Sequence, residues 1–359
     1  MTIVDVRVHC LQIPTRPAFP PAVHEGAASR HTLIEVETDD GLVGAGEAFR
    51  LAPEAVKALI RDDLRPLLIG QPEAEIHAMA AALRRHVFRF GRTGIAMMAI
   101  SGIEVALWDI LGQRAGLPLV DLLGGRCRPD LRAYASLPRY GSPRDAAFIA
   151  ARCVEDGFGG VKLHQSDPAF AGEVRAAIGP DVALMFDAGG AWTPRDALDA
   201  AHVLAVHDVL WLEEPVSAMA DYAGIAWLAS RSPVRIAGGE NEYGAGGFVQ
   251  PIERRSFDVL QPDIIKCGGI SETRKILALA EAHNIEVALH CYCHGPGLLA
   301  TAHLSLATPG IEWLEIVPTE IAIGVLDAPL RVIDGKVCVP DTPGLGAKLD
   351  YSTFSKPQI

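Results

Sequence analysis

The chain has 359 residues, 49% of them hydrophobic and 21% charged, and its formal net charge is −12. This composition is typical of a globular protein with one large core or two domains, and the negative charge argues against a nucleic-acid or anionic-membrane surface. We expect no membrane partner, because no apolar run approaches the roughly 18 residues of a spanning helix and no signal-like N-terminus is present. The seven cysteines are scattered and favour reduced thiols in a cytoplasmic enzyme, since Cys291-x-Cys293 beside His294 resembles a metal motif only weakly.

The first part of the chain predicts an α+β unit. Residues 3–13 are rich in β-branched residues and predict a strand, and residues 31–48 predict two strands joined at Asp40-Gly41, a strong hairpin signal. Residues 14–30 lie between them and are rich in Pro and Ala, which favours neither a helix nor a central strand. A loop of this length in a compact domain is usually functional. From about residue 53 to 123 the pattern is helical.

After Gly125, short apolar runs alternate with helical segments rich in Ala and Leu. This alternation predicts βαβ units and a parallel sheet, and eight such runs predict a closed barrel. A notable polar residue stands at the end of successive predicted strands, and these residues are His164, Asp187, Glu213, Glu240, Asp263, His290 and Glu315. Because sites of (β/α) barrels form at the C-terminal ends of the strands, we expect these side chains to share one site.

Three of these residues indicate a metal site. Asp187, Glu213 and Glu240 follow successive strands, and three adjacent carboxylates would repel one another without a cation. Mg2+ prefers six oxygen ligands, so three carboxylates leave about three positions for water and substrate, as in a catalytic site. The alternative is three independent surface acids at the starts of loops.

The remaining polar residues indicate proton transfer. Asp263 next to His290 would fix the tautomer of the ring and raise its basicity, which favours a general acid or base over a structural histidine. Lys162 and His164 are two residues apart and share one face of a strand. Lys162 would hold a substrate carboxylate or an oxyanion, and neutral His164 could take a proton, although a basic pair that only offsets nearby acids is the alternative.

Several stretches together resemble a known family. The segment ALWDILGQRAGLPLVDLLGG, the motifs FDA, EEP, GGEN and EWLE, and QPDIIKCGG followed by a histidine are similar to the mandelate racemase group of the enolase superfamily, within the mandelate racemase / muconate lactonizing enzyme family. The resemblance implies an α+β capping domain (residues 1–125), a modified TIM barrel of (β/α)7β type (126–318) and a C-terminal segment returning to the cap (319–359). Enolase-superfamily sites use a Lys or His base with Mg2+ stabilising an ene-diolate.

The resemblance also implies residue roles. The Mg2+ ligands are Asp187, Glu213 rather than Glu214, and Glu240; Glu315 contacts the region of the substrate carboxylate, and Lys266 is structural. Relatives carry a catalytic lysine where Asp263 stands. The chain departs from the family at two positions: His164 replaces the second lysine of a Lys-x-Lys pattern, and Gly189 replaces the usual Asn.

The expected reaction removes a proton α to a carboxylate and gives an ene-diolate held by Mg2+, Lys162 and Glu315. We favour dehydration of an acid sugar to a 2-keto-3-deoxy acid, because a small polar pocket opened by Gly189 and Gly190 suits a polyhydroxy substrate. Alternatives are a racemase or epimerase of a 2-hydroxy acid and a lactone cycloisomerase. A non-catalytic anion-binding barrel is disfavoured, because neither a ligand nor a dyad residue is missing.

Two further expectations concern assembly and the long loop. The family resemblance suggests a symmetric homo-oligomer. We expect the 14–30 loop to close over a small carboxylate substrate and set specificity, with Arg16, His24 and Arg30 as candidate contacts.

Overall fold

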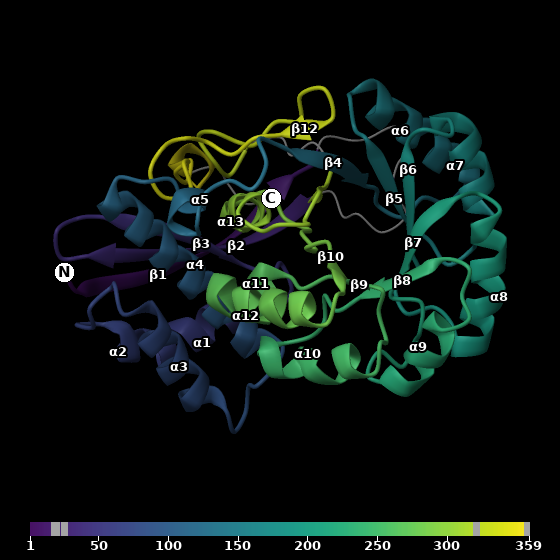
Figure 1. Cartoon of the computed structure of the whole chain (residues 1–359). Helices are drawn as coiled ribbons and strands as arrows, with labels where there is room; N and C mark the ends of the chain where they lie inside the picture. The colour runs from purple at the N-terminus through teal and green to yellow at the C-terminus, as the bar shows by residue number, and fades with distance from the viewer. Residues whose placement is uncertain (16–21, 23–27, 319–323, 355–359) are drawn as a thin grey trace.

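The N-terminal part of the chain folds into a three-stranded antiparallel sheet of order β1-β2-β3, with helices packed against it (Figure 1). The computed structural model describes residues 1–15, 22, 28–318 and 324–354. The strands are β1 (Ile3–Pro14), β2 (Ala28–Thr38) and β3 (Val43–Ala48). The predicted hairpin at Asp40-Gly41 is confirmed, because Gly41 takes the left-handed φ of 87° that the turn between β2 and β3 needs.

The loop predicted for residues 14–30 is shorter than expected. Pro14 pairs with Ala28 and Gln12 pairs with Arg30, so both ends of this stretch belong to strands and the prediction is wrong there. The reason is that β2 pairs with β3 only from Thr32 onward, so the first residues of β2 have β1 as their partner strand. Pro14 is the last residue of an edge strand, where a missing N–H is tolerated.

Helices follow the sheet as the sequence predicted. They are α1 (Pro53–Leu59), the π-helix η1 (Ile60–Leu64), α2 (Arg65–Leu68), α3 (Ile76–Val87), α4 (Ile95–Ala115) and α5 (Leu119–Leu122). β3 lies so close to α4 that a Cβ on Gly46 would collide with the carbonyl oxygen of Gly102. Glycine at both positions therefore allows the helix to pack directly on the sheet.

Helix α4 corrects the expectation that no apolar run approaches the length of a membrane span. It is 21 residues long with a mean hydropathy of 1.6, and 89% of its most apolar stretch is buried inside the protein. Its two acids are buried as well and accept hydrogen bonds from the rest of the chain: Glu104 from the N–H groups of Ile270 (2.7 Å) and Ser271 (2.9 Å), and Asp109 from Ala45 N–H (2.9 Å). It is therefore a core helix that joins the cap to the barrel.

The barrel predicted from the alternating pattern is confirmed. Eight parallel strands form it: β4 (Leu131–Ser136), β5 (Gly160–His164), β6 (Ala183–Asp187), β7 (Val209–Glu213), β8 (Arg235–Gly238), β9 (Val259–Leu260), β10 (Glu286–Val287) and β11 (Trp313–Ile316). Among the described residues no ladder joins β10 to β11, and the gap is crossed by Cys291 N–H, which donates to Glu315 Oε2 at 2.9 Å. The sheet therefore curls into a barrel whose ladder of hydrogen bonds is interrupted between β10 and β11.

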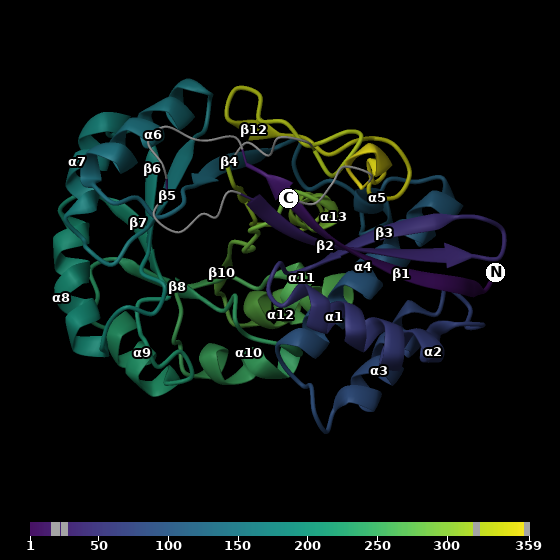
Figure 2. The same cartoon turned by 180° about the vertical axis from the view of Figure 1, so that it is seen from behind.

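The connecting helices surround the strands, as Figures 1 and 2 show from opposite sides. They are α6 (Pro143–Glu155), α7 (Phe170–Ile178), α8 (Pro194–Ala205), α9 (Tyr222–Ala229), α10 (Gly244–Glu253), α11 (Ile264–Cys267), α12 (Gly269–Ala282) and α13 (Pro296–Leu306). Helices α6 and α8 begin alike, because Ser142 and Thr193 each cap the helix and a proline occupies its first turn.

The end of the chain contacts both parts. Strand β12 (Lys336–Val337) pairs with β4, Leu345 N–H donates to Asp109 Oδ1 at 2.8 Å, and the short helix η2 (Tyr351–Thr353) places the Tyr351 hydroxyl against Glu35 of β2. The domain boundaries at residues 125 and 318 remain predictions.

Candidate active site

Three carboxylates meet at the C-terminal ends of neighbouring strands. Asp187 and Glu213 are the last residues of β6 and β7, and Glu240 follows β8 by two residues. Single oxygens of the three lie within 4.8 Å of one another, with Asp187 and Glu213 buried. Burial raises the pKa of the Glu213 carboxyl, and the charge of Asp187 raises it further against the opposing effect of Lys162. This set of hard oxygen donors fits a divalent cation such as Mg2+.

Lys162 is fully buried on β5 beside this cluster. Its Nζ lies 2.6 Å from Glu213 Oε1 and 2.8 Å from Glu315 Oε1. Burial alone would lower the pKa of this ammonium, but Glu213 and Glu315 hold it well above its ordinary value. Lys162 is therefore a fixed positive charge that donates a hydrogen bond to Glu213 and forms an ion pair with Glu315.

Two neighbours orient Glu213 and were missed in the sequence. Gln261 Nε2 donates to Glu213 Oε2 at 2.6 Å, and Trp211 Nε1 donates to the same oxygen at 3.1 Å. Each stands two residues before a residue predicted for the site, Asp263 and Glu213 respectively. Period-two alternation on a strand, applied to these neighbours, was the signal that could have found them.

His164 faces the cluster from the end of β5. The carbonyl oxygen of Leu137 lies 2.6 Å from His164 Nδ1 and can only accept a hydrogen bond, so Nδ1 carries the proton. Nε2 is then directed at Asp187 Oδ2, 3.0 Å away. Burial lowers the pKa of this imidazole, but Asp187 raises it more, and the net direction is upward. The ring of Tyr292 meets that of His164 edge-on at 5.9 Å.

Asp263 and His290 lie together on the other flank of the cluster. Asp263 Oδ2 is 2.7 Å from His290 Nδ1, and Asp263 Oδ1 accepts the N–H of Ile265 at 2.8 Å as the cap of α11. His290 Nε2 lies 3.1 Å from Glu240 Oε2. Burial lowers the pKa of His290, but Glu240, Glu315 and Asp263 together raise it to about 10.

Lys266 is closer to the site than its predicted structural role suggests. Its Nζ donates to Glu240 Oε1 at 3.1 Å and to Asn241 Oδ1 at 2.7 Å. Asn241 in turn donates to both oxygens of Glu214, at 3.1 and 3.0 Å. Both oxygens of Glu214 are thus engaged by Asn241, while burial and the charge of Glu240 raise the pKa of its carboxyl, and the three-carboxylate cluster contains Glu213 rather than Glu214.

Of the three candidate contacts from the long loop, the structure describes only Arg30. Arg16 and His24 lie outside the described residues. Arg30 is exposed on β2 and lines a cleft of about 480 Å3 with Cys10, Gln12 and Glu54, none of which is a predicted site residue. Its role in substrate binding stays a prediction.

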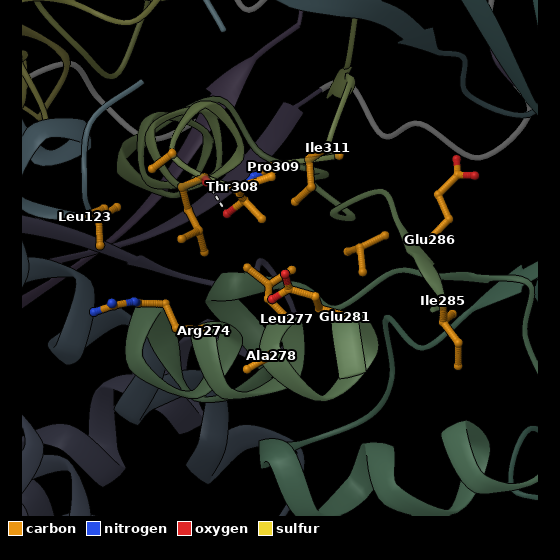
Figure 3. Close-up of a pocket in the computed structure, with 14 residues that line it drawn as sticks. Leu123, Arg274, Leu277, Ala278, Glu281, Ile285, Glu286, Thr308, Pro309 and Ile311 are labelled. Atoms are coloured by element: carbon orange, nitrogen blue, oxygen red, sulfur yellow. Dashed lines mark hydrogen bonds between the residues drawn. The ribbon is translucent and has the colours of Figure 1, made fainter. Parts of the chain in front are cut away.

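A second cleft lies at the opposite end of the barrel (Figure 3). It has a volume of about 450 Å3 and is lined by the C-terminal half of α12, the start of β10 and the turn before β11, including Glu286 and Ile311. Glu286 is already paired with Arg235. In barrels this end contributes to stability, and active sites are built at the other end.

Comparison with known proteins agrees with the geometry. Residues 3–124 match the family described as mandelate racemase / muconate lactonizing enzyme, N-terminal domain, and residues 145–353 match enolase C-terminal domain-like. The chain belongs to the mandelate racemase / muconate lactonizing enzyme family of the enolase superfamily. It is therefore an enzyme of the class that abstracts a proton α to a carboxylate.

Relatives in this family carry different activities. A D-galactarolactone cycloisomerase of Agrobacterium fabrum is 34% identical over 99% of this chain and 98% of its own length. An arabinonate dehydratase of Saccharolobus solfataricus is 32% identical over 90% of this chain and 89% of its own. The crystal structure of a racemase from Streptomyces coelicolor with bound magnesium superposes with a TM-score of 0.88 at 30% identity, covering 98% of both chains.

Proposed function

We propose that this protein is a Mg2+-dependent acid-sugar dehydratase that forms a 2-keto-3-deoxy acid. One observation carries the proposal: two histidines flank the carboxylate cluster, with His164 Nε2 3.0 Å from Asp187 and His290 Nε2 3.1 Å from Glu240. An elimination needs one group to take the proton α to the carboxylate and another to give a proton to the departing oxygen.

The metal would be held by Asp187, Glu213 and Glu240. Three carboxylates within 4.8 Å of one another, two of them buried, support this assignment, because their mutual repulsion is relieved by a divalent charge. When bound, the ion supplies positive charge that makes the α-proton of a nearby carboxylate more acidic.

Lys162 holds the developing negative charge on the substrate carboxylate. Its ammonium donates to Glu213 and forms an ion pair with Glu315 at 2.8 Å, and with three N–H groups it can also donate to a substrate oxygen. Because both partners are buried and fixed, the ammonium needs no reorganisation as the ene-diolate forms. Glu315 is itself oriented by Cys291 N–H.

The two histidines then divide the proton transfers. Because the carbonyl of Leu137 retains the proton on Nδ1, Nε2 is the nitrogen of His164 that takes the α-proton when the ring is neutral. His290 is held by Asp263 through Nδ1, and its raised pKa keeps Nε2 protonated at neutral pH, so it serves as the acid. The α-proton passes to His164, the β-C–O bond breaks, and the hydroxyl leaves as water with a proton from His290. The resulting enol tautomerises to the 2-keto acid.

Cycloisomerisation is the second candidate, because the same groups can expel a ring oxygen instead of a hydroxyl. It is favoured by the match to the D-galactarolactone cycloisomerase, which extends over 99% of this chain, against 90% for the arabinonate dehydratase. In this case the departing oxygen stays in the molecule and no water is lost. Racemisation, with His290 returning a proton to the opposite face, is the third.

A screen of acid sugars, their lactones and their anhydro forms with Mg2+ tests the proposal. Formation of a keto acid from open-chain acids supports dehydration. If only the cyclic forms give a keto acid, the reaction is a cycloisomerisation instead. A change in optical rotation without keto acid indicates a racemase or epimerase. Turnover that persists after thorough chelation contradicts the metal-dependent step. The homo-oligomer stays a prediction, and light scattering would test it.

A further inference from the structure

Arg139 is a cation at the rim of the barrel that the proposed reaction does not use. It lies in the turn that follows β4 and is half-buried. Within the described part of the chain its guanidinium makes neither a hydrogen bond nor an ion pair. An arginine that is always charged and partly removed from water, yet has no acceptor, is incomplete without an anion.

The position of this guanidinium places it beside the metal cluster. A Cβ on Gly189 would lie 3.8 Å from Arg139 Nη2, so the arginine reaches over the glycine that follows Asp187 by two residues. Gly189 N–H donates to Asp187 Oδ1 at 2.7 Å, which fixes this turn to the first candidate ligand. The absence of a side chain at Gly189 leaves the space above it to the guanidinium and to a ligand.

The turn that carries Arg139 is held in place on both sides. Leu137 N–H donates to the carbonyl of Lys162 at 2.9 Å, and the carbonyl of Leu137 accepts from His164. On the other side, Gln165 Nε2 donates to the carbonyl of Tyr140 at 3.1 Å. Because three bonds tie residues 137–140 to the end of β5, Arg139 is presented by a rigid loop next to His164.

We propose that Arg139 binds a second carboxylate of the substrate, so that the enzyme acts on sugar diacids or their lactones rather than on monoacids. The metal and Lys162 meet the carboxylate that reacts, and Lys266 is occupied by Glu240 and Asn241. Arg139 is thus a free donor for a further anion, and its planar fork matches the two oxygens of a carboxylate. A hydroxyl would leave its charge uncompensated in a partly desolvated site. This assignment rests on the proposed function, because it assumes a sugar acid in the site.

The test compares diacids and monoacids of matched configuration. Binding of galactarate and galactonate, with further hexarate and hexonate pairs, is measured by calorimetry in Mg2+, and kcat/KM replaces Kd where a compound is turned over. We expect wild type to prefer diacids by about 10- to 100-fold, the range of a charge-assisted hydrogen bond. Arg139→Gln should abolish the preference, and Arg139→Lys should keep part of it, because lysine retains the charge but not the fork. Arg144→Gln, at an exposed arginine of α6, is the matched control and should keep the preference.

The outcomes separate this assignment from the proposed function. Equal affinity of wild type for diacids and monoacids, or a diacid preference that survives in Arg139→Gln, overturns the assignment. A stronger preference for a 6-phosphohexonate also overturns it in favour of a phosphate site. If the preference depends on Arg139 but no compound gives keto acid, the proposed dehydration fails and the assignment stands. A Mg2+-dependent rise in Tm in Arg139→Gln verifies that the variant is folded with its metal cluster intact.

Discussion

Asp263 and His290 are joined twice, by a 2.7 Å hydrogen bond between Oδ2 and Nδ1 and by a parallel backbone bridge. The strands that precede them, β9 and β10, are each two residues long. The bridge therefore continues the ladder to the rim and fixes both residues relative to the barrel. As a result the imidazole has one free nitrogen, Nε2, and it points at Glu240.

Removing a metal ligand should remove both activity and Mg2+-dependent stabilisation. In wild type a bound ion relieves the repulsion among Asp187, Glu213 and Glu240, so millimolar Mg2+ should raise Tm by several degrees. Glu213→Gln should reduce turnover by at least about 100-fold and abolish the rise in Tm, as measured by differential scanning fluorimetry with and without chelator. Glu253→Gln, at an exposed acid of α10, is the control. Unchanged turnover in Glu213→Gln would contradict the ligand assignment.

Deuterium exchange should separate the two histidines. With His164 as the base, His164→Asn should abolish exchange of the α-proton with solvent deuterium, whereas His290→Asn should retain exchange and block elimination. Lys162→Met should lose both, because the ene-diolate is then unsupported. Mass spectrometry of recovered substrate measures the exchange. The opposite pattern for the two histidines would make His290 the base and leave His164 to position a distal hydroxyl.

The sequence predicted the strand ends well for a physical reason. Burying an ionisable side chain is costly, so Asp187 or Glu213 at the end of an apolar run stands out against its neighbours. Contacts between distant elements had no such signal. The turn that brings Arg139 over Gly189 depends on hydrogen bonds to the backbone carbonyls of Leu137 and Tyr140. Every residue has such a carbonyl, so the sequence gives no sign of these bonds.

Two other differences have similar causes. Lys266 reaches Glu240 through a short helix, α11, whose direction the residue pattern did not specify. Two acids interrupt the apolar sequence of α4, so its length did not stand out. The backbone N–H groups that stabilise these acids inside the core, such as those of Ile270 and Leu345, lie far away in the chain.

Glu104 should contribute to stability by holding the cap against the start of α12. It accepts hydrogen bonds from the N–H groups of Ile270 and Ser271 and from Trp108 Nε1 at 2.8 Å. Glu104→Ala would leave the buried N–H groups of Ile270 and Ser271 without an acceptor, whereas Trp108 Nε1 keeps Ser271 Oγ at 3.2 Å, and we expect a cost of about 3 kcal/mol in the free energy of unfolding. Urea unfolding at pH 7 measures the loss, and Glu75→Ala, at an exposed acid before α3, should change it by less than about 0.5 kcal/mol. A loss of less than about 1 kcal/mol in Glu104→Ala would show that water replaces Glu104 as the acceptor.

His303 should make stability fall in mild acid. It is fully buried on α13, where Nδ1 accepts Val120 N–H at 3.1 Å and Nε2 donates to the carbonyl of Leu345 at 3.2 Å, so the ring is neutral. Burial lowers its pKa to about 4. Between that value and about 6.5, the ordinary histidine pKa, the unfolded chain takes up a proton that the native protein does not. The contribution of the neutral His303 to the free energy of unfolding is therefore fully present above about pH 6.5, and about 3 kcal/mol of it is lost as the pH approaches 4.

The variant His303→Gln isolates this contribution, because glutamine cannot take up the proton. It should be less stable than wild type at pH 7.5, since its amide does not fill the space of the ring, but its stability should decline less between pH 6.5 and 4.5. Urea unfolding at several pH values measures both slopes. His202→Gln, at an exposed histidine of α8, is the matched control and should follow the wild-type profile. If His303→Gln loses stability in acid as steeply as wild type, the decline originates in other groups, and the neutral His303 between Val120 and Leu345 contributes no pH dependence.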